Sequence, residues 1–416
     1  MARWVRAIRH YPHFAKRCFG VKSPMKEDLG TVLCRHIRSA GPISVAEYMK
    51  IAMHHPVYGY YNNSTVLGPE GDFVTSPEIS QIFGEILGVW IVNEWINYGK
   101  NTPFDVVELG PGRGTLMATV IKALCKFPTG SSLFRRLHFV ERSDRLREMQ
   151  ESAISPILKT YCIKPELLWH SSLDGVPGGC VTFYLANEFF DALPIHRFQR
   201  VDDDWKEVFV SAISPSNPLE PGDRLAFVTS PSSTIAASTY LPLAGNLSDR
   251  NFVEVCPEAG AIVQKLAARI ATDGGSALIS DYGHLGECED TLRAFKDHKL
   301  HDPLKDPGQA DITADVDFAF LRRSVEATKE PVIFHGPVSQ AYFLVHMGTL
   351  LRLKVLVENT KLEEDKRRLI AATEMLIGSN QMGKRFKFIA LTPGRSKKEK
   401  EHIPGGFYPT WDTDKA

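Results

Sequence analysis

The sequence contains few cysteines, and their spacing excludes two common ways of stabilising a protein. The chain has 416 residues and seven cysteines, an odd number, and no two of them form a C-x-x-C pair. An even number of closely spaced cysteines would indicate a disulfide framework, and C-x-x-C pairs would indicate a zinc site. We therefore expect neither a disulfide framework nor a bound metal, and this cysteine usage is typical of a reducing compartment.

The sequence also has no excess of one sign of charge, and it has no long apolar run. Lysine plus arginine and aspartate plus glutamate number 49 each, and no basic block interrupts the body of the chain. This balance argues against nucleic acid as a partner. The longest apolar candidate, residues 341–357, contains His346, Arg352 and Lys354, so we expect no transmembrane segment.

The first 25 residues lack acidic side chains. No acid precedes Glu27, whereas basic residues are frequent there. The apolar residues that share one side of a helical wheel are Trp4, Ile8, Tyr11 and Phe14. A basic, amphipathic and acid-poor start is typical of a mitochondrial transit peptide, so residues 1–25 predict a location in the mitochondrion (matrix). The low serine content leaves a basic tail or a helix on a membrane surface as alternatives.

The rest of the chain is long enough for a large core and more than one structural unit. The expected divisions are a helical N-terminal region (26–103), an α/β domain (104–393) with an insertion at about 195–250, and a charged tail (394–416). Within the insertion, residues 195–211 predict a hairpin. Residues 212–250 are rich in Ser, Pro and Gly and are expected to lie outside the core.

One long helix is predicted over residues 77–98, because apolar residues recur there near helical spacing. Ser76 is its expected N-cap, Pro77 its first residue and Glu78 a first-turn acid.

A glycine-rich loop dominates the α/β part. An apolar strand ends at Glu108, glycines follow at positions 110, 112 and 114, and a helix is predicted over residues 115–127. Glycines at alternate positions let the backbone approach a ligand closely, and the helix start offers free N–H groups. The stretch therefore predicts a loop that binds a nucleotide-like ligand on an α/β sheet.

The glycine spacing narrows the choice of ligand. The dinucleotide fingerprint is G-x-G-x-x-G, but Thr115 stands where its third glycine belongs. The form found, with Gly110, Gly112 and Gly114 after an acid, resembles motif I of S-adenosylmethionine methyltransferases. The acid at Glu108 suits the cationic groups of that cofactor. The alternative is a glycine turn needed only for strand–helix packing.

Later strand ends supply further candidate cofactor contacts. The strand at 137–140 ends at Glu141, where doubly wound folds bind ribose hydroxyls. A salt bridge from Glu141 to Arg142 or Arg145 is the alternative. Ser172 and Leu173 follow the next strand and are expected to border the adenine.

A polar cluster follows the apolar strand at 181–186. Asn187, Glu188 and Asp191 are expected beside the glycine loop, because ligands of open α/β sheets bind where the strand order reverses. Asn187 is placed with the cofactor, and Glu188 and Asp191 with a methyl acceptor. Capping of the next turn by Asn187 or Asp191 is the alternative. Near residue 313, Thr313 or Asp315 is expected to be an N-cap.

Several motifs in the same order resemble the MidA-like methyltransferase family, over roughly residues 26–393. They are residues 71–80 (GDFVTSPEIS), 108–116 (ELGPGRGTL), 187–194 (NEFFDALP), 281–284 (DYGH) and 310–318 (ADITADVDF). The resemblance implies a Rossmann-like class I S-adenosylmethionine-dependent methyltransferase sheet. Its vertebrate mitochondrial branch implies symmetric dimethylation of an arginine in a matrix-side core subunit of respiratory complex I. The implied partner is that subunit or an early assembly intermediate, and the implied role is complex I assembly.

An arginine acceptor would need acidic side chains. The guanidinium stays protonated, and carboxylates that grip it hold its plane and draw its charge toward two nitrogens. We hypothesise that Glu188 is the principal clamp, with Asp191, Glu258 or Glu78 as the second acid. Alternatives are a methyltransferase acting on a small molecule or on oxygen, and a non-catalytic assembly chaperone with a retained fold. A nicotinamide oxidoreductase is disfavoured by Thr115.

Overall fold

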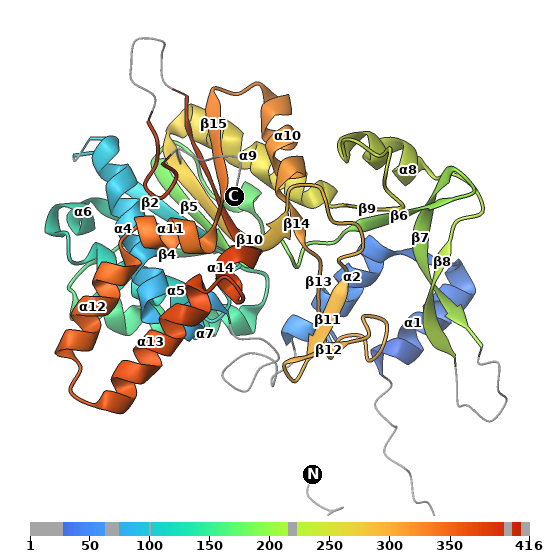
Figure 1. Ribbon diagram of the computed structural model, residues 1–416, viewed down its shortest axis with the longest axis horizontal. Coiled ribbons are helices and arrows are strands. Elements are labelled where there is room, and N and C mark those ends of the chain that lie inside the picture. Colours follow the sequence, from blue (N-terminus) through green and yellow to red (C-terminus); the bar gives the residue numbers. More distant parts are fainter. Residues whose placement is uncertain (1–27, 63–74, 100, 215–222, 395–401, 409–416) are drawn as a thin grey trace, which may run out of the picture.

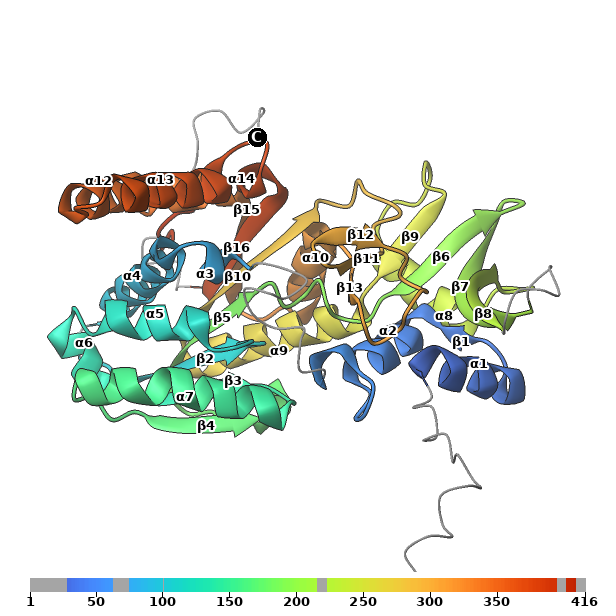
Figure 2. The same ribbon diagram turned by 90° about the horizontal axis from the view of Figure 1, so that it is seen from below.

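The computed structural model describes residues 28–62, 75–99, 101–214, 223–394 and 402–408. The chain forms two lobes that lie side by side (Figures 1 and 2). The sheet lobe is built on an eight-stranded sheet, and the second lobe on a five-stranded antiparallel sheet. The predicted transit peptide lies outside the described residues, as does most of the predicted tail. Among the described helices, none has both the length and the apolarity needed to cross a membrane.

The central sheet has the topology of a doubly wound fold. Its strands are β2 (Phe104–Leu109), β3 (Phe134–Val140), β4 (Glu166–His170), β5 (Val181–Asn187), β10 (Gly275–His284), β14 (Val316–Asp317), β15 (Val332–Ser339) and β16 (Phe386–Pro393). The order is β15-β16-β10-β5-β2-β3-β4, with β14 paired to the end of β10. The strands from β10 to β4 are parallel, and β16 is antiparallel to both its neighbours. The chain turns from one side of the sheet to the other between β2 and β5, which makes a switch point. The predicted Rossmann-like α/β fold is confirmed.

Both faces of this sheet are buried, as a parallel sheet requires. Along β2 and β5, Val106 and Phe183 pack into one apolar cluster, whereas Val107 and Tyr184 pack into another on the opposite face. Helices α9 (Pro257–Asp273) and α10 (Phe318–Thr328) cover the face with Val107. The other face is covered by α4 (Gln81–Asn97), α5 (Thr115–Leu124) and α7 (Asp144–Thr160). The remaining helices of this lobe are α6 (Pro128–Leu133), α11 (Gln340–His346), α12 (Thr349–Asn359), α13 (Glu363–Ile377) and α14 (Met382–Arg385).

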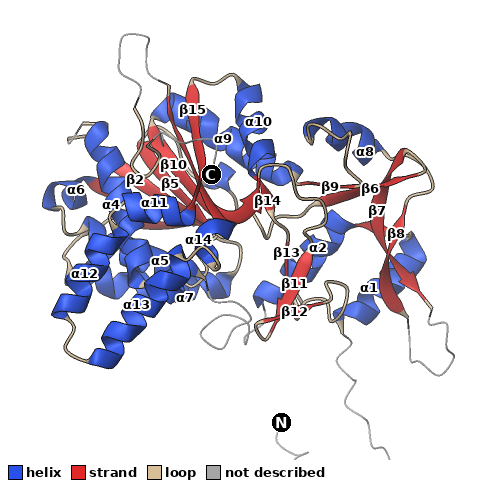
Figure 3. Ribbon diagram, in the orientation of Figure 1, coloured by secondary structure: helices blue, strands red, loops and turns tan. Residues whose placement is uncertain are grey.

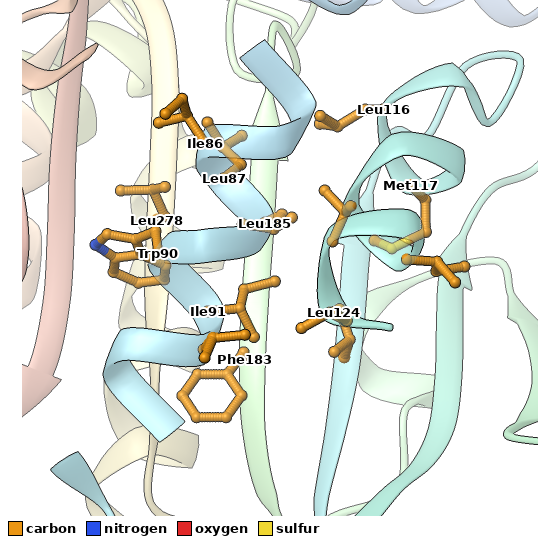
Figure 4. Close-up of a cluster of buried hydrophobic side chains, with 14 of the residues drawn as sticks. Ile86, Leu87, Trp90, Ile91, Leu116, Met117, Leu124, Phe183, Leu185 and Leu278 are labelled. Atoms are coloured by element: carbon orange, nitrogen blue, oxygen red, sulfur yellow. The ribbon is translucent and has the colours of Figure 1, made fainter. Parts of the chain in front are cut away.

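Helices α4 and α5 approach each other closely because two glycines of α4 face α5. A Cβ atom on Gly84 would lie 2.7 Å from Thr119 Cβ, and one on Gly88 would lie 2.6 Å from Ala123 Cβ. Figure 4 shows the apolar side chains of α4 and α5 above strands β5 and β10, with Trp90 buried among them. The two glycines therefore determine how closely α4 packs against α5.

The single helix predicted over residues 77–98 is wrong. The structure has a short helix, α3 (Ser76–Ile79), and then α4, because Ser80 between them is extended (φ −151°, ψ 133°). The Ser80 hydroxyl accepts a hydrogen bond from the Ile82 N–H and so caps α4 itself. The predicted capping role of Ser76 is also wrong: Thr75 occupies that position, and Ser76 lies inside α3.

The second lobe combines the N-terminal helices with strands from the middle of the chain. Its larger sheet contains β1 (Ile43–Ser44), β7 (Asp204–Ile213), β6 (His196–Val201), β9 (Phe252–Val255) and β8 (Arg224–Thr229). Its smaller sheet contains β12 (Lys299–His301), β11 (Arg293–Lys296) and β13 (Asp311–Thr313), and its helices are α1 (Leu29–Ala40), α2 (Val45–His54) and α8 (Ile235–Tyr240). Figure 3 shows these strands grouped apart from the central sheet, beside α1 and α2.

A separate apolar cluster holds the second lobe together. Leu33 and Tyr48 of α1 and α2 pack there with Val210 of β7 and Ile312 of β13. The predicted hairpin at 195–211 is confirmed by the pairing of β6 with β7. The expectation that residues 212–250 lie outside the core is wrong for α8, because Ala237 is 1% exposed and packs into the cluster beneath α9.

Candidate active site

A cavity of about 440 Å³ opens where the parallel strands end, between the two lobes. Its walls come from the loops after β2, β3, β4 and β5, from α3 and the start of α9, and from the second lobe. The predicted site residues that line it are Glu78, Glu108, Gly110, Gly112, Glu141, Ser172, Leu173, Asn187, Glu188, Asp191 and Glu258. The structure therefore brings almost all of the predicted residues together in one place.

The three glycines of the loop have different surroundings. All adopt positive φ angles, of 64° at Gly110, 51° at Gly112 and 82° at Gly114, which favour glycine. A Cβ on Gly110 would meet the Phe189 ring at 2.6 Å, whereas a Cβ on Gly112 would meet nothing within 4 Å. Gly114 is the N-cap residue of α5 and lies against Gln150, outside the cavity wall. Gly112 therefore presents bare backbone to the cavity, and Gly114 serves the packing of α5 on α7.

Glu108 lies at the end of β2 with its carboxyl group out of contact with water. The residue is 2% exposed, and its Oε2 atom is buried without a hydrogen-bond partner. Burial raises the pKa of Glu108 to about 8, because the charged form loses its hydration. A cationic group in the cavity would stabilise the carboxylate, so this side chain suits a positively charged ligand.

Glu141 is held by the start of α7. Its Oε1 atom accepts hydrogen bonds from the N–H groups of Arg142 (2.7 Å) and Ser143 (2.8 Å). The Arg147 guanidinium instead donates to the carbonyl oxygen of Glu141, at 2.6 Å. The carboxylate is thus oriented by backbone groups and lines the cavity after β3.

Gln150 of α7 connects the glycine loop with Glu141 and with β4, and the sequence analysis did not predict this role. Its Nε2 atom donates to the Gly112 carbonyl at 2.7 Å and lies 3.3 Å from Glu141 Oε2. Its Oε1 atom accepts from Trp169 Nε1 at 2.8 Å. The sequence signal for this role is a polar side chain at a buried position of α7, because a buried polar group needs a hydrogen-bond partner.

Ser172 and Leu173 lie where the chain leaves β4 and begins a short 3₁₀ turn, Leu173–Gly175. The Arg269 guanidinium of α9 donates to the carbonyl oxygens of Leu173 (3.0 Å) and Val176 (2.8 Å) and fixes this turn. Both residues line the cavity, and the Leu173 side chain offers an apolar surface there.

Glu188 follows β5 in an unusual backbone conformation, with φ at 49°. Non-glycine residues rarely adopt it, and such strain gathers at functional sites. Its Oε1 atom accepts from the N–H and from the hydroxyl of Ser76, both at 2.8 Å, and from Asn187 Nδ2 at 3.3 Å. Its Oε2 atom is buried without a partner. Burial raises the pKa of Glu188 to about 7, although the bonds from Ser76 oppose the shift.

Asp191 has a similar arrangement. Its Oδ2 atom accepts a hydrogen bond from the Tyr282 hydroxyl, and its Oδ1 atom is buried without a partner. The residue is 7% exposed, and burial raises its pKa to about 6. In both Glu188 and Asp191, one carboxyl oxygen thus accepts hydrogen bonds from the protein and the other has no partner.

Asp281 holds the loop that carries these two acids. Its Oδ2 atom accepts from the N–H groups of Phe189, Phe190 and Asp191, at 2.9–3.2 Å. Burial and the nearby carboxylates of Asp191 and Glu188 raise the pKa of Asp281. The sequence analysis gave Asp281 only as part of the motif at 281–284, since its hydrogen-bond partners lie about ninety residues earlier.

The other two candidate acids are placed less favourably for an acceptor. Glu258 Oε2 lies 3.6 Å from Lys50 Nζ, and Glu258 Oε1 lies 3.9 Å from Arg142 Nη2, so both of its oxygens already face cations, one from each lobe. Glu78 lines the cavity from α3. Neither has a buried unpartnered oxygen such as those of Glu188 and Asp191.

The second lobe contributes residues that the sequence analysis did not assign. Tyr61 and Asp311 line the cavity, as does Thr313. Burial and the carboxylates of Asp311 and Asp191 raise the pKa of Tyr61 well above its ordinary value. The predicted capping by Thr313 or Asp315 is wrong, because Asp317 caps α10 by accepting from the Phe320 N–H. Within the described ranges, no group of three or more metal-ligating side chains occurs.

The chain resembles known proteins over most of its length. A model of the family described as S-adenosyl-L-methionine-dependent methyltransferases matches residues 86–338. The protein named "Protein arginine methyltransferase NDUFAF7, mitochondrial" from Xenopus laevis is 42% identical over 94% of this chain and 91% of its own. The protein of that name from Homo sapiens is 43% identical, over 91% and 86%. The Drosophila melanogaster homolog is 46% identical, over 86% and 83%.

Solved structures share the fold. A protein from Burkholderia thailandensis bound to S-adenosyl-homocysteine superposes with a TM-score of 0.72 at 24% identity, and covers 88% of this chain and 92% of its own. A second crystal structure from the same organism gives 0.72 at 26% identity, over 91% and 93%. The two-lobed arrangement is therefore found in solved structures.

Proposed function

Because this chain belongs to the family of S-adenosylmethionine-dependent methyltransferases, we propose that it methylates an arginine side chain of a protein. The MidA-like resemblance, the cofactor S-adenosylmethionine and the mitochondrial location are confirmed by the family and by the relatives' names. The finer proposal is symmetric dimethylation of an arginine in a matrix-side core subunit of respiratory complex I, for complex I assembly. Relatives named arginine methyltransferases support the acceptor, and the MidA-like resemblance supports the subunit.

The cavity fits S-adenosylmethionine in the chemistry of its donors. The unpartnered carboxyl oxygen of Glu108 would face a cationic group, and Gly112 would let the backbone lie against the ligand. Glu141, oriented by the start of α7, would hold the ribose hydroxyls. Ser172 and Leu173 would border the adenine, and Asn187 would lie on the cofactor side. When bound, the cofactor supplies a methyl group on a cationic sulfur and leaves as S-adenosylhomocysteine.

One observation carries the arginine proposal. Two buried carboxylates from one loop, Glu188 and Asp191, each keep an oxygen atom without a partner beside the same cavity. Leaving such oxygens buried is costly, and a cation with several N–H donors would repay that cost. A guanidinium has five such donors in a planar fork and stays charged. A neutral hydroxyl or amine acceptor would leave these oxygens less well satisfied.

The chain's own residues would then do most of the work by positioning and by electrostatics. Glu188 and Asp191 would hold two edges of the guanidinium and draw its positive charge toward the bound nitrogens. The nitrogen left free would use its lone pair to form the new N–C bond as the C–S bond breaks, with the electron pair going to sulfur. That nitrogen loses one proton. This proton would pass to water, because both acids would be engaged with the other two nitrogens.

Asp191 is the second acid favoured by the geometry. Glu258 is engaged by Lys50 and Arg142, and Glu78 lies on the α3 side of the cavity. Asp191 shares its loop with Glu188, and the same aspartate, Asp281, fixes that loop. This places the two acids in a fixed relation to each other.

Substituting single acids in the purified protein tests the proposal. Glu188→Gln keeps the size of the side chain and the bonds from Ser76, but removes its charge. We expect it to lower labelled methyl transfer to arginine at least a hundredfold, whereas calorimetry shows S-adenosylmethionine binding within about threefold of wild type. The matched control Glu258→Gln should keep most of the activity. Full arginine methylation by Glu188→Gln, with the cofactor bound, would overturn the clamp.

A second arm separates the competing functions. Wild-type protein should transfer label to protein or peptide arginine and not to a pool of small metabolites. Transfer to a metabolite alone would point to a small-molecule enzyme. If cells that lack the protein regained complex I when given a variant unable to bind cofactor, the role would be that of a chaperone.

A further inference from the structure

We propose that Ser76 and Tyr282 are positioning residues that hold one oxygen of each clamp acid, so that the other oxygen faces the acceptor in a fixed orientation. In this arrangement the guanidinium receives one oxygen from Glu188 and one from Asp191, and not both oxygens of a single carboxylate. The inference rests on the proposed function of this cavity as an arginine methyltransferase site. Ser76 belongs to α3 and Tyr282 to β10, and each acts through the acid that it holds. Tyr282 also lines the cavity.

Ser76 fixes Glu188 with two donors. Its N–H and its hydroxyl both reach Glu188 Oε1 at 2.8 Å, and Ser76 is fully buried. Because both donors bind the same oxygen, any turn of the Glu188 carboxylate about its last bond breaks both hydrogen bonds, except a half-turn, which only exchanges its two equivalent oxygens. The other oxygen, Oε2, is thereby held away from α3 and stays without a partner.

The backbone of Glu188 is fixed as well. Its N–H donates to the Ser280 carbonyl at 2.9 Å, and the Ser280 hydroxyl donates to Asn187 Oδ1 at 2.7 Å. The backbone of Glu188 is therefore anchored to β10, and its carboxylate to α3.

Tyr282 fixes Asp191 in the corresponding way. Its hydroxyl donates to Asp191 Oδ2, which leaves Oδ1 as the unpartnered oxygen. The ring of Tyr282 is itself held by cations, since the guanidinium groups of Arg293 and Arg385 lie 4.9 Å and 5.6 Å from its centroid. Arg293 is in turn paired with Asp315. A rigid phenol thus determines the orientation of the aspartate.

The arrangement has a consequence for repeated methylation. Each methyl group replaces one N–H donor of the guanidinium, so a monomethylated arginine has fewer ways to satisfy two fixed oxygens. A carboxylate that is free to turn could grip the monomethylated side chain in unproductive orientations. Loosening either acid should therefore slow the second transfer more than the first. The ratio of monomethyl to dimethyl product then reports the positioning, and a general loss of stability would not change this ratio.

The test uses Ser76→Ala and Tyr282→Phe in the full-length protein, with methylarginine products separated by mass spectrometry. Each variant removes one hydroxyl and keeps the acid that the hydroxyl held. We expect kcat to fall on the order of tenfold, as loss of a hydrogen bond to a charged group predicts. The affinity for S-adenosylmethionine should stay within about twofold, and the monomethyl-to-dimethyl ratio should rise several-fold. Ser76→Thr, which keeps a hydroxyl, should restore the wild-type ratio.

Matched controls remove a buried hydroxyl elsewhere. Ser80→Ala deletes the hydroxyl that caps α4, and Tyr184→Phe deletes a buried phenol of β5 that does not line the cavity. Both should lower stability without changing the product ratio. If Ser76→Ala does not fold, Tyr282→Phe decides the question by itself. Wild-type product ratios and kcat in both hydroxyl variants would overturn the positioning roles and leave the arginine activity intact. Absence of methylarginine with the wild-type protein would overturn both proposals.

Discussion

Ser76 and Glu188 lie 112 residues apart in the sequence, and two hydrogen bonds of 2.8 Å from Ser76 converge on one oxygen of Glu188. This contact joins a short helix from the N-terminal part of the chain to the end of β5. The second oxygen of Glu188 remains buried without a partner beside the cavity. The contact therefore explains how the buried carboxylate of Glu188, a residue with a strained backbone, is held in one orientation that suits a cationic acceptor.

The pH dependence of acceptor methylation should report the two clamp acids. Burial raises the pKa of Glu188 to about 7 and that of Asp191 to about 6. Both must be ionised to hold a guanidinium, and kcat/KM reports the free enzyme. We therefore expect kcat/KM to rise as the pH rises from about 5 and to level off above about 8. A value of kcat/KM that is constant from pH 5 to 8 would contradict an anionic clamp.

Cofactor binding should release protons near neutral pH. Glu108 is buried and its pKa is raised to about 8, so it is mostly protonated at pH 7 in the free protein. A cationic ligand beside it would lower that pKa and expel the proton. Calorimetric titrations with S-adenosylmethionine in two buffers of different ionisation enthalpy should therefore give different observed enthalpies. Glu108→Gln should abolish the difference, and equal enthalpies for wild type would contradict the contact.

The same residue should make stability depend on pH in an unusual direction. The folded-state pKa of Glu108 lies above its ordinary value of 4.5, so the folded protein holds the proton more tightly than the unfolded chain. Its contribution to the free energy of unfolding is present below pH 4.5 and is lost as the pH rises through about 8. Relative to wild type, Glu108→Gln should have a higher Tm at pH 8.5 and a similar Tm at pH 5. Thermal unfolding at both values checks this, and a lower Tm at pH 8.5 would refute it.

A side chain at Gly112 should block the cofactor. Gly112→Val places a branched side chain in open space beside the cavity, at a φ of 51°. We expect calorimetry to detect no binding of S-adenosylmethionine. The control is Gly179→Val, because Gly179 also has a positive φ, 84°, with nothing near its Cβ position, but does not line the cavity. It should carry similar backbone strain, on the order of 1–2 kcal/mol, and bind normally. If Gly112→Val bound S-adenosylmethionine normally, the glycine loop would not be part of the cofactor site.

The close packing of α4 on α5 can be tested by a compensating pair. Gly88→Ala adds a methyl group 2.6 Å from Ala123 Cβ and should destabilise the protein by about 1–3 kcal/mol. Adding Ala123→Gly removes the opposing atom, so the two changes together should cost less than the sum of their separate effects. Denaturant unfolding of the four proteins measures this coupling. Strict additivity would show that the contact does not limit the packing.

The parts of the site that depend on local sequence could be predicted. The strand, the glycine turn and the acids at 108 and 141 all follow from hydrophobic pattern and from position at strand ends. The loop after β5 was placed correctly at the cavity for the same reason, since carboxyl ends of parallel strands meet at one edge of a sheet.

The rest depends on contacts between distant segments. The sequence predicts that Ser76 caps a helix, and only the fold shows that its hydroxyl binds a carboxylate 112 residues away. The same is true of Tyr282 and Asp281, because their hydrogen-bond partners are on the loop after β5. Gly114 fits the ligand motif in sequence, but in the fold it packs against Gln150. No periodic pattern indicates that Tyr61 reaches this cavity from the second lobe.

The most direct measurement is labelled methyl transfer into a complex I subassembly, followed by mass-spectrometric mapping of the modified residue. The subassembly should come from mitochondria that lack this protein, so that its acceptor is unmodified. We predict that wild-type protein places label on an arginine of a core matrix-side subunit, as symmetric dimethylarginine, and that Glu188→Gln places almost none. Label on no arginine of the subassembly, by a protein that binds S-adenosylmethionine, would contradict the account.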